Sequence, residues 1–134
     1  GSFYKWDIGN QLPLVEEIGW RRLSQPPEGS WVDYENCDMR FIDIRERIKF
    51  LKFGYGRATD QINIEIRNGR ISREEGLFIV KETDGKVSKK NENDFCNFLE
   101  ITREEYLTII DSFVNKNIFS TIQLGEYSLK YERV

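Results

Sequence analysis

The chain has 134 residues, a net charge of −3 and no histidine. This length suits one domain, whose core would bury roughly two-thirds of the surface of the unfolded chain. The absence of histidine excludes a Ser-His or Cys-His catalytic pair and removes the commonest metal ligand, so we expect no metal site. The acidic balance disfavours a nucleic-acid partner. No apolar stretch approaches the roughly 20 residues that span a bilayer, so we expect no membrane partner.

The two cysteines, Cys37 and Cys96, lie far apart and form no recognisable pattern. Unpatterned thiols fit a reducing compartment, which favours a cytoplasmic protein. We expect both side chains to behave as small core residues.

The first predicted helix lies within residues 7–18. Asp7 can cap its amino end, and Gly19 is a stop signal. Pro13 lies inside the pattern, which leaves open a later start near Leu12.

A loop is predicted for residues 20–36, because prolines, glycines and an asparagine interrupt any regular pattern there. It carries Trp31 and Tyr34, whose large rings we expect to be covered. The tryptophans Trp6, Trp20 and Trp31 are all predicted to pack in the core or against another domain.

A helix is predicted over residues 38–53 from a stripe of apolar side chains at steps of three and four. The stripe consists of Phe41, Ile44, Ile48 and Leu51. Arg45, Lys49 and Lys52 form a second stripe with the same spacing. This basic stripe is either a solvated face or a face whose Lys52 end meets a ligand.

Residues 50–60 read Phe-Leu-Lys-Phe-Gly-Tyr-Gly-Arg-Ala-Thr-Asp, the most informative string in the chain. Gly54 and Gly56 allow the backbone to approach a ligand, and the flanking cations can meet phosphate or carboxylate. The alternative is a tight connection between two helices, with Gly54 just past the first helix and Tyr55 packed in the joint.

Together with Glu-Ile-Arg-Asn-Gly-Arg at 65–70 and Arg-Glu-Glu-Gly at 73–76, this string resembles the C-terminal region of the N-acetyl sugar amidotransferases. The resemblance covers about residues 4–115. These ATP-dependent enzymes act in lipopolysaccharide and surface-glycan biosynthesis. The chain lacks the family's Ser-Gly-Gly-Lys-Asp-Ser pyrophosphatase loop and its Cys-x-x-Cys pairs, and it opens on Gly1-Ser2, which looks like a tag scar. We therefore expect an excised domain that is inactive alone; a complete small protein is the alternative.

The resemblance also implies a reaction and its participants. ATP adenylates the amide oxygen of an N-acetyl group on an activated sugar, and ammonia then displaces AMP to leave an acetamidino group. ATP and Mg belong to the parent enzyme, and no cofactor is expected in this chain. The implied partners are a missing N-terminal pyrophosphatase domain, a sugar nucleotide substrate and an ammonia-supplying glutaminase.

Seven positions are implied as substrate- or phosphate-binding residues, whereas no catalytic residue is assigned. They are Lys52, Gly54, Tyr55, Gly56, Arg57, Asp60 and Arg67. We expect Lys52 and Arg57 to meet phosphates and to contribute little to stability, with Asp60 orienting Arg57 or a sugar hydroxyl. Gln61 stands where many family members carry histidine, which puts proton transfer at this position in doubt. Arg67 has a structural alternative, capping carbonyls at a helix end.

Residues 60–67 carry conflicting signals. Ile62, Ile64 and Ile66 alternate with polar residues, which slightly favours a strand. The start and stop signals on either side, and the family resemblance, favour a helix, and a helix is our prediction.

Capping boxes predict the starts of two later helices. They are Ser-Arg-Glu-Glu at 72–75 and Thr-Arg-Glu-Glu at 102–105. Between them, a polar linker is predicted over residues 87–93, followed by a short helix that holds Phe95, Phe98 and Leu99.

The tail alternates apolar and polar residues on both sides of Gly125, which predicts a β-hairpin. The fold prediction is mainly α: an array of about five helices with a small C-terminal β-hairpin, divided into residues 1–116 and 117–134. The predicted core consists of Phe41, Ile44, Ile48, Leu51, Val80, Phe95, Leu99, Ile109, Ile110 and Phe113. The second function hypothesis is a stand-alone helical module that binds a protein through its aromatic loop. The sequence leaves open which sugar is modified and the oligomeric state.

Overall fold

The computed structural model describes residue 3 and residues 7–131, which form six helices and one two-stranded antiparallel sheet. The helices are α1 (Ile8–Glu17), α2 (Ile42–Phe53), α3 (Arg57–Arg67), α4 (Arg73–Thr83), α5 (Lys89–Leu99) and α6 (Arg103–Phe113). The strands are β1 (Phe119–Gln123) and β2 (Glu126–Leu129). The predicted mainly helical fold with a C-terminal hairpin is confirmed. None of the helices in the described ranges is long and apolar enough to cross a membrane.

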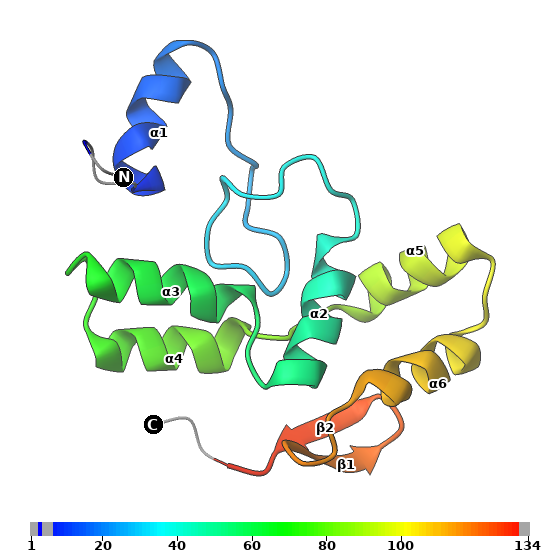
Figure 1. Ribbon diagram of the computed structural model, residues 1–134. Coiled ribbons are helices and arrows are strands. Elements are labelled where there is room, and N and C mark those ends of the chain that lie inside the picture. Colours follow the sequence, from blue (N-terminus) through cyan, green and yellow to red (C-terminus); the bar gives the residue numbers. More distant parts are fainter. Residues whose placement is uncertain (1–2, 4–6, 132–134) are drawn as a thin grey trace.

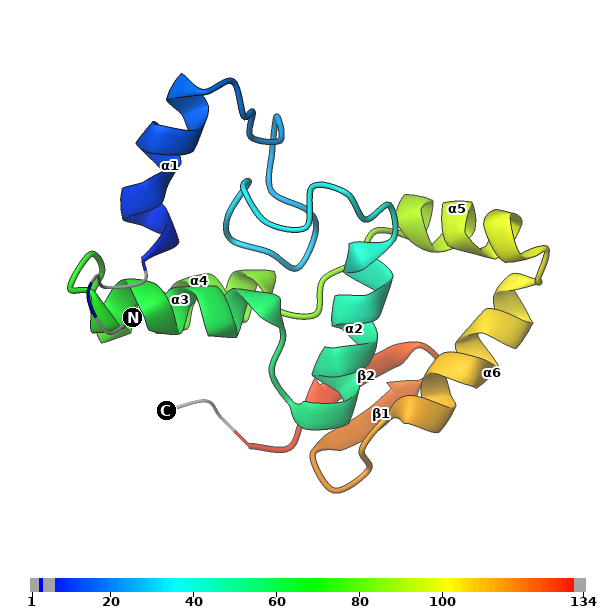
Figure 2. The same cartoon turned by 45° about the horizontal axis from the view of Figure 1, so that its top comes forward.

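Helix α2 stands in the middle of the molecule (Figure 1). On one side of it, α3 and α4 lie side by side and antiparallel; on the other side lie α5, α6 and the hairpin (Figures 1 and 2). Helix α1 is separated from α2 by the long loop 18–41 and lies nearest to α3 (Figure 2).

The main core lies between α2, α5, α6 and the hairpin. Its buried members are Ile44, Phe50, Leu51, Cys96, Tyr106, Ile110, Val114 and Phe119. The rings of Phe50 and Phe119 meet edge to face, with their centroids 5.2 Å apart, so the hairpin is anchored directly on α2.

The helix pair α3–α4 packs closely because of a glycine inside α4. A Cβ on Gly76 would lie 2.7 Å from a side-chain atom of Ile66 and 2.8 Å from one of Ile62. These two isoleucines are four residues apart and share the face of α3 that meets α4. Ile64 lies on another face and lines a pocket beside α1. Residues 60–67 are therefore helical, as predicted. The isoleucines alternate because they pack on two different faces of the same helix, which explains the strand-like pattern.

Local capping places three helix starts. Ser72 and Thr102 form complete capping boxes with Glu75 and Glu105, as predicted. The side chain of Ser88 accepts a hydrogen bond from the Asn91 amide and starts α5 at Lys89. The predicted linker over 87–93 is therefore wrong for most of its length, because an N-cap begins the helix well before its apolar residues.

At the amino end, α1 begins at Ile8 and contains Pro13, so the later start near Leu12 is not observed. In the following loop, Cys37 and Trp31 are exposed, and Trp20 is partly buried. The core prediction was therefore wrong for Cys37, whereas Cys96 is buried as expected. Trp31 is not a core residue of this domain, and packing against another domain stays a prediction. Trp6 lies outside the described residues.

The predicted core is right for seven residues and wrong for three. Ile44, Leu51, Val80 and Ile110 are buried, and Phe41, Ile48 and Phe95 pack partly buried against the main core. Three members of the prediction are instead exposed, namely Leu99 (46%), Ile109 (48%) and Phe113 (39%). In α6 the inward stripe consists of Tyr106, Ile110 and then Val114. Ile109 and Phe113 lie one residue earlier and are as apolar as Ile110 and Val114, so spacing could not show which pair faces inward.

Two adjacent isoleucines test this assignment. Ile110→Ala should lower the free energy of unfolding by about 2–5 kcal/mol, since its side chain is buried in the main core. Ile109→Ala is the matched control and should cost about 1 kcal/mol or less, because its side chain is half exposed. Urea unfolding of both variants measures the difference, and equal losses would mean that the inward face of α6 is misassigned.

Candidate functional site

The Gly-Tyr-Gly turn connects α2 to α3. Gly54 ends α2 with a φ of 80°, and its amide donates to the carbonyl of Phe50 over 2.7 Å. The predicted alternative of a helix connector therefore accounts for Gly54. Tyr55 is 42% exposed rather than packed in the joint, and the Lys49 ammonium lies 4.8 Å from the centre of its ring.

The amino end of α3 is capped by a residue from the end of α4. The buried carboxylate of Asp84 accepts hydrogen bonds from the Gly56 amide at 2.9 Å, the Thr59 amide at 3.1 Å and the Thr59 hydroxyl. A Cβ at position 56 would lie 2.8 Å from Asp84 Oδ1, so this approach requires glycine. The neighbouring Ala58 amide donates to the Gly29 carbonyl over 3.2 Å. These three amides are therefore committed to protein acceptors, and a phosphate near the turn would rely on side chains.

A network of alternating charges surrounds the first turn of α3. Arg57 donates to Glu35 Oε2 through Nε at 2.8 Å and Nη2 at 2.6 Å. Its Nη1 lies 3.7 Å from Asp60 Oδ2, and this same oxygen pairs with Lys49. The structure thus brings Arg57 and Asp60 together, as expected, and adds two residues that the prediction missed, Lys49 and Glu35. Lys49 was marked by its place on the basic stripe of α2; Glu35 carried no signal.

Two of the predicted residues lie outside this network. The Lys52 ammonium lies over the rings of Phe53 and Phe113, 5.5 and 5.7 Å from their centres, and pairs with no carboxylate within the described part of the chain. Arg67 is ten residues beyond Arg57 on α3, which places it about 15 Å farther along the helix axis. Its Nε donates to the Asn63 carbonyl at 3.1 Å, so it bonds within its own helix.

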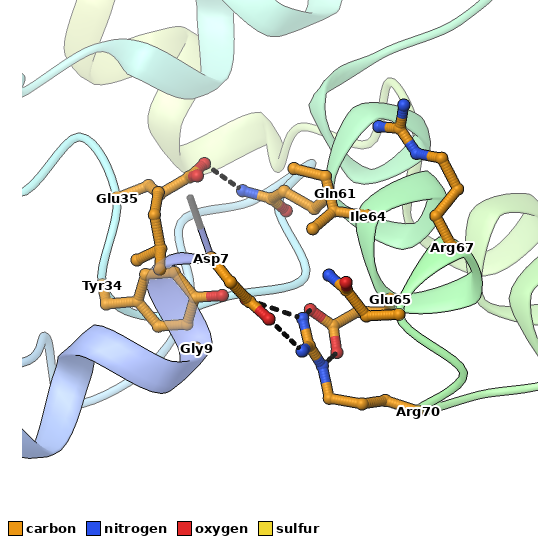
Figure 3. Close-up of a pocket in the computed structure, with 11 residues that line it drawn as sticks. Asp7, Gly9, Tyr34, Glu35, Gln61, Ile64, Glu65, Arg67 and Arg70 are labelled. Atoms are coloured by element: carbon orange, nitrogen blue, oxygen red, sulfur yellow. Dashed lines mark hydrogen bonds and ion pairs between the residues drawn. The ribbon is translucent and has the colours of Figure 1, made fainter. Parts of the chain in front are cut away.

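Arg67 instead lines a pocket of about 400 Å³ between α1, the loop at Tyr34 and Glu35, and α3 (Figure 3). Arg70 closes one side of it. Its guanidinium donates to both oxygens of the buried Asp7 carboxylate, at 2.8 and 3.2 Å, and to Glu65, which ties α1 to α3. Hydrogen bonds to these two carboxylates raise the pKa of Arg70.

Gln61 connects the pocket to the charge network. Its side chain is buried, with Nε2 donating to Glu35 Oε2 at 2.7 Å and Oε1 accepting from the Trp31 amide at 2.7 Å. Both ends of the amide are engaged, so Gln61 fixes the position of the Glu35 carboxylate. This arrangement favours a positioning role for Gln61.

Four groups that line the pocket have polar atoms with no protein partner among the described residues. They are the Tyr34 hydroxyl, Glu35 Oε1, the terminal nitrogens of Arg67 and the side-chain amide of Asn68. Burial and the nearby carboxylates Glu65 and Glu35 raise the pKa of Tyr34, so its hydroxyl keeps its proton at neutral pH. In residue 3 and residues 7–131, no group of three or more Cys, Asp or Glu is arranged to hold a metal ion.

The Asp84 cap is tested by comparing two acidic residues at the end of α4. Asp84→Ala should lower the free energy of unfolding by at least about 2 kcal/mol, because it leaves buried amides without an acceptor. Glu82→Ala should change stability by about 0.5 kcal/mol or less, since Glu82 is exposed and its ion pair with Lys86 lies at the surface. Denaturant unfolding gives both values. A loss for Asp84→Ala no larger than for the control would show that the cap does not hold α3 in place.

Comparison with protein-family models gives one finding. Residues 28–132 match the family described as LPS biosynthesis protein WbpG-like, C-terminal domain. A search of curated proteins found no match. The matched range includes α2 to α6 and the hairpin, and therefore the Gly-Tyr-Gly turn, Glu35 and the α3 side of the pocket.

Proposed function

Because the chain belongs to the family of WbpG-like C-terminal domains of lipopolysaccharide biosynthesis proteins, we propose that it is the substrate-side domain of an ATP-dependent N-acetyl sugar amidotransferase. The observation that carries this proposal is the family match over residues 28–132. The motifs that resemble the amidotransferases, between residues 50 and 76, lie within that range.

The proposed reaction converts an acetamido group to an acetamidino group. The amide oxygen attacks the α-phosphorus of ATP and releases pyrophosphate, and ammonia then adds to the activated carbon and expels AMP. We assign ATP and Mg to a preceding pyrophosphatase domain and the ammonia to a partner glutaminase. The Gly56, Ala58 and Thr59 amides of this chain are committed to protein acceptors, which supports a nucleotide site elsewhere.

Lys52 is the cation beside the Gly-Tyr-Gly turn that is best suited to meet a phosphate. It is exposed, has no carboxylate partner among the described residues, and lies two residues before the turn. Arg57 is held by Glu35 through two nitrogen atoms. Its role in the proposal is to position Glu35 and Asp60, so the expectation that Arg57 contributes little to stability is revised.

A protein-interaction module is the second candidate, favoured by the exposed rings around Lys52. Phe53 and Phe113 both approach its ammonium and are exposed, and Tyr55 lies near Phe53 with ring centroids 6.3 Å apart. A surface of this kind is typical of a docking site. Activity of the parent enzyme separates the two candidates, since only the first requires chemistry.

The chemistry is tested with this domain joined to its pyrophosphatase domain. AMP should form from ATP only when an N-acetylated sugar nucleotide and ammonium ions are both present, because each is consumed in the proposed reaction. The 134-residue chain alone should form no AMP above a buffer control. AMP production by the parent that does not depend on the sugar would contradict the proposal.

Two substitutions separate a substrate-binding role from a positioning role. Lys52→Ala in the parent should lower kcat/KM roughly tenfold, about 1.4 kcal/mol, without changing the melting temperature of the domain. Arg57→Ala should lower turnover by roughly two orders of magnitude, because Glu35 and Asp60 would no longer be held in position. It should also cost about 1.5–3 kcal/mol of stability, because Glu35 loses its charged donor.

Lys81→Ala, at an exposed lysine of α4, is the control and should change neither value. Full activity of Lys52→Ala would remove Lys52 from the substrate site. An unchanged melting temperature for Arg57→Ala would mean that its ion pair with Glu35 does not hold the loop to α3.

A further inference from the structure

The pocket in Figure 3 is built by three segments that are distant in sequence. Ile8 and Gly9 come from α1, Tyr34 and Glu35 from the loop, and the remaining wall from α3 and the turn after it. Its volume of about 400 Å³ is within the range of small-molecule sites.

One side of the pocket is an ion-pair group that offers a ligand no free cation. Arg70 binds Asp7 and Glu65 together, and Figure 3 shows these three side chains meeting beside Tyr34. The guanidinium is shared by two carboxylates, so this group fixes the walls and keeps a net charge of −1.

The polar groups that remain are a mixture of donors and acceptors. The Tyr34 hydroxyl can donate or accept, Glu35 Oε1 accepts, and the Asn68 amide offers one of each. A sugar hydroxyl also both donates and accepts, so a ring of such groups suits a polyol. Ile8 and Ile64 line the same pocket and offer apolar contacts to the carbon–hydrogen face of a sugar ring.

Arg67 adds a cation at the exposed edge of this pocket. Its Nε is bonded to the Asn63 carbonyl, while its two terminal nitrogens have no protein partner among the described residues. In Figure 3 its guanidinium extends away from Arg70 and its ion pairs. A planar guanidinium with free nitrogens suits the oxygens of a phosphate.

We propose that this pocket binds a sugar phosphate, with Tyr34, Glu35 and Asn68 on the sugar hydroxyls and Arg67 on the phosphate. The inference rests on the proposed function for its biological context and deepens it by naming the residues that hold the substrate. It also assigns a role to Gln61, which holds the Glu35 carboxylate at the edge of the pocket.

The test uses the full 134-residue chain and N-acetylglucosamine 1-phosphate as the probe, with binding followed by calorimetry and by amide chemical shifts. The probe should bind and shift amides around Tyr34 and residues 61–70. Arg67→Ala should weaken it at least tenfold, whereas binding of N-acetylglucosamine itself should not change. Tyr34→Phe should weaken both ligands severalfold by removing the hydroxyl alone.

Arg45→Ala is the control, because Arg45 is an exposed arginine of α2 that does not line the pocket. Retained melting temperatures show that the variants are folded. Inorganic phosphate that binds as tightly as the sugar phosphate would overturn the sugar part of the proposal. Amide shifts confined to the turn at residues 52–57, or equal affinity of Arg67→Ala and Arg45→Ala, would overturn the pocket as the site.

The outcome is separable from that of the proposed function. An active parent enzyme whose KM for the sugar nucleotide is unchanged by Tyr34→Phe and Arg67→Ala would refute the pocket and leave the function standing. Binding of the probe through these residues, with a parent that forms no AMP, would refute the function and leave the pocket standing.

Discussion

The buried carboxylate of Asp84 joins the carboxyl end of α4 to the amino end of α3. It follows α4 and caps α3, so one side chain fixes both the antiparallel pairing and the direction in which α3 leaves the turn. The next residue, Gly85, has a φ of 69° and leaves no room for a Cβ against the ring of Phe50, which seats this connection on α2. The Gly29 carbonyl accepts a hydrogen bond from the Ala58 amide. This bond positions the loop that carries Glu35.

Features set by neighbouring residues could be predicted from the sequence. The capping boxes at Ser72 and Thr102 depend on side chains three residues apart, and the end of α2 is marked by Gly54. The hairpin turns at Gly125, whose φ is 89°, and pairs Phe119 with Leu129. In each case the chemistry that determines the structure lies within a short window of the chain, which is why local patterns were sufficient.

Features set by distant residues could not be predicted in this way. The partners Arg57 and Glu35 are 22 residues apart, and Arg70 and Asp7 are 63 apart, so no local spacing relates them. The inward face of α6 is likewise set by distant residues, since Ile109 and Ile110 are equally apolar and only the position of the main core decides which of them is buried. The sequence placed Arg57 and Asp60 near each other, whereas Glu35 and Lys49, and the separation of Arg67 from Arg57, required the fold.

The Gly56 amide has a consequence for dynamics that follows from its unusual acceptor. The first amides of a helix ordinarily face solvent and exchange their protons quickly, whatever the stability of the domain. Here that proton is donated to a carboxylate that follows another helix, 28 residues away. Its exchange with solvent therefore requires α3 and the end of α4 to separate, so one backbone proton reports the opening of a tertiary contact and not the fraying of a helix end.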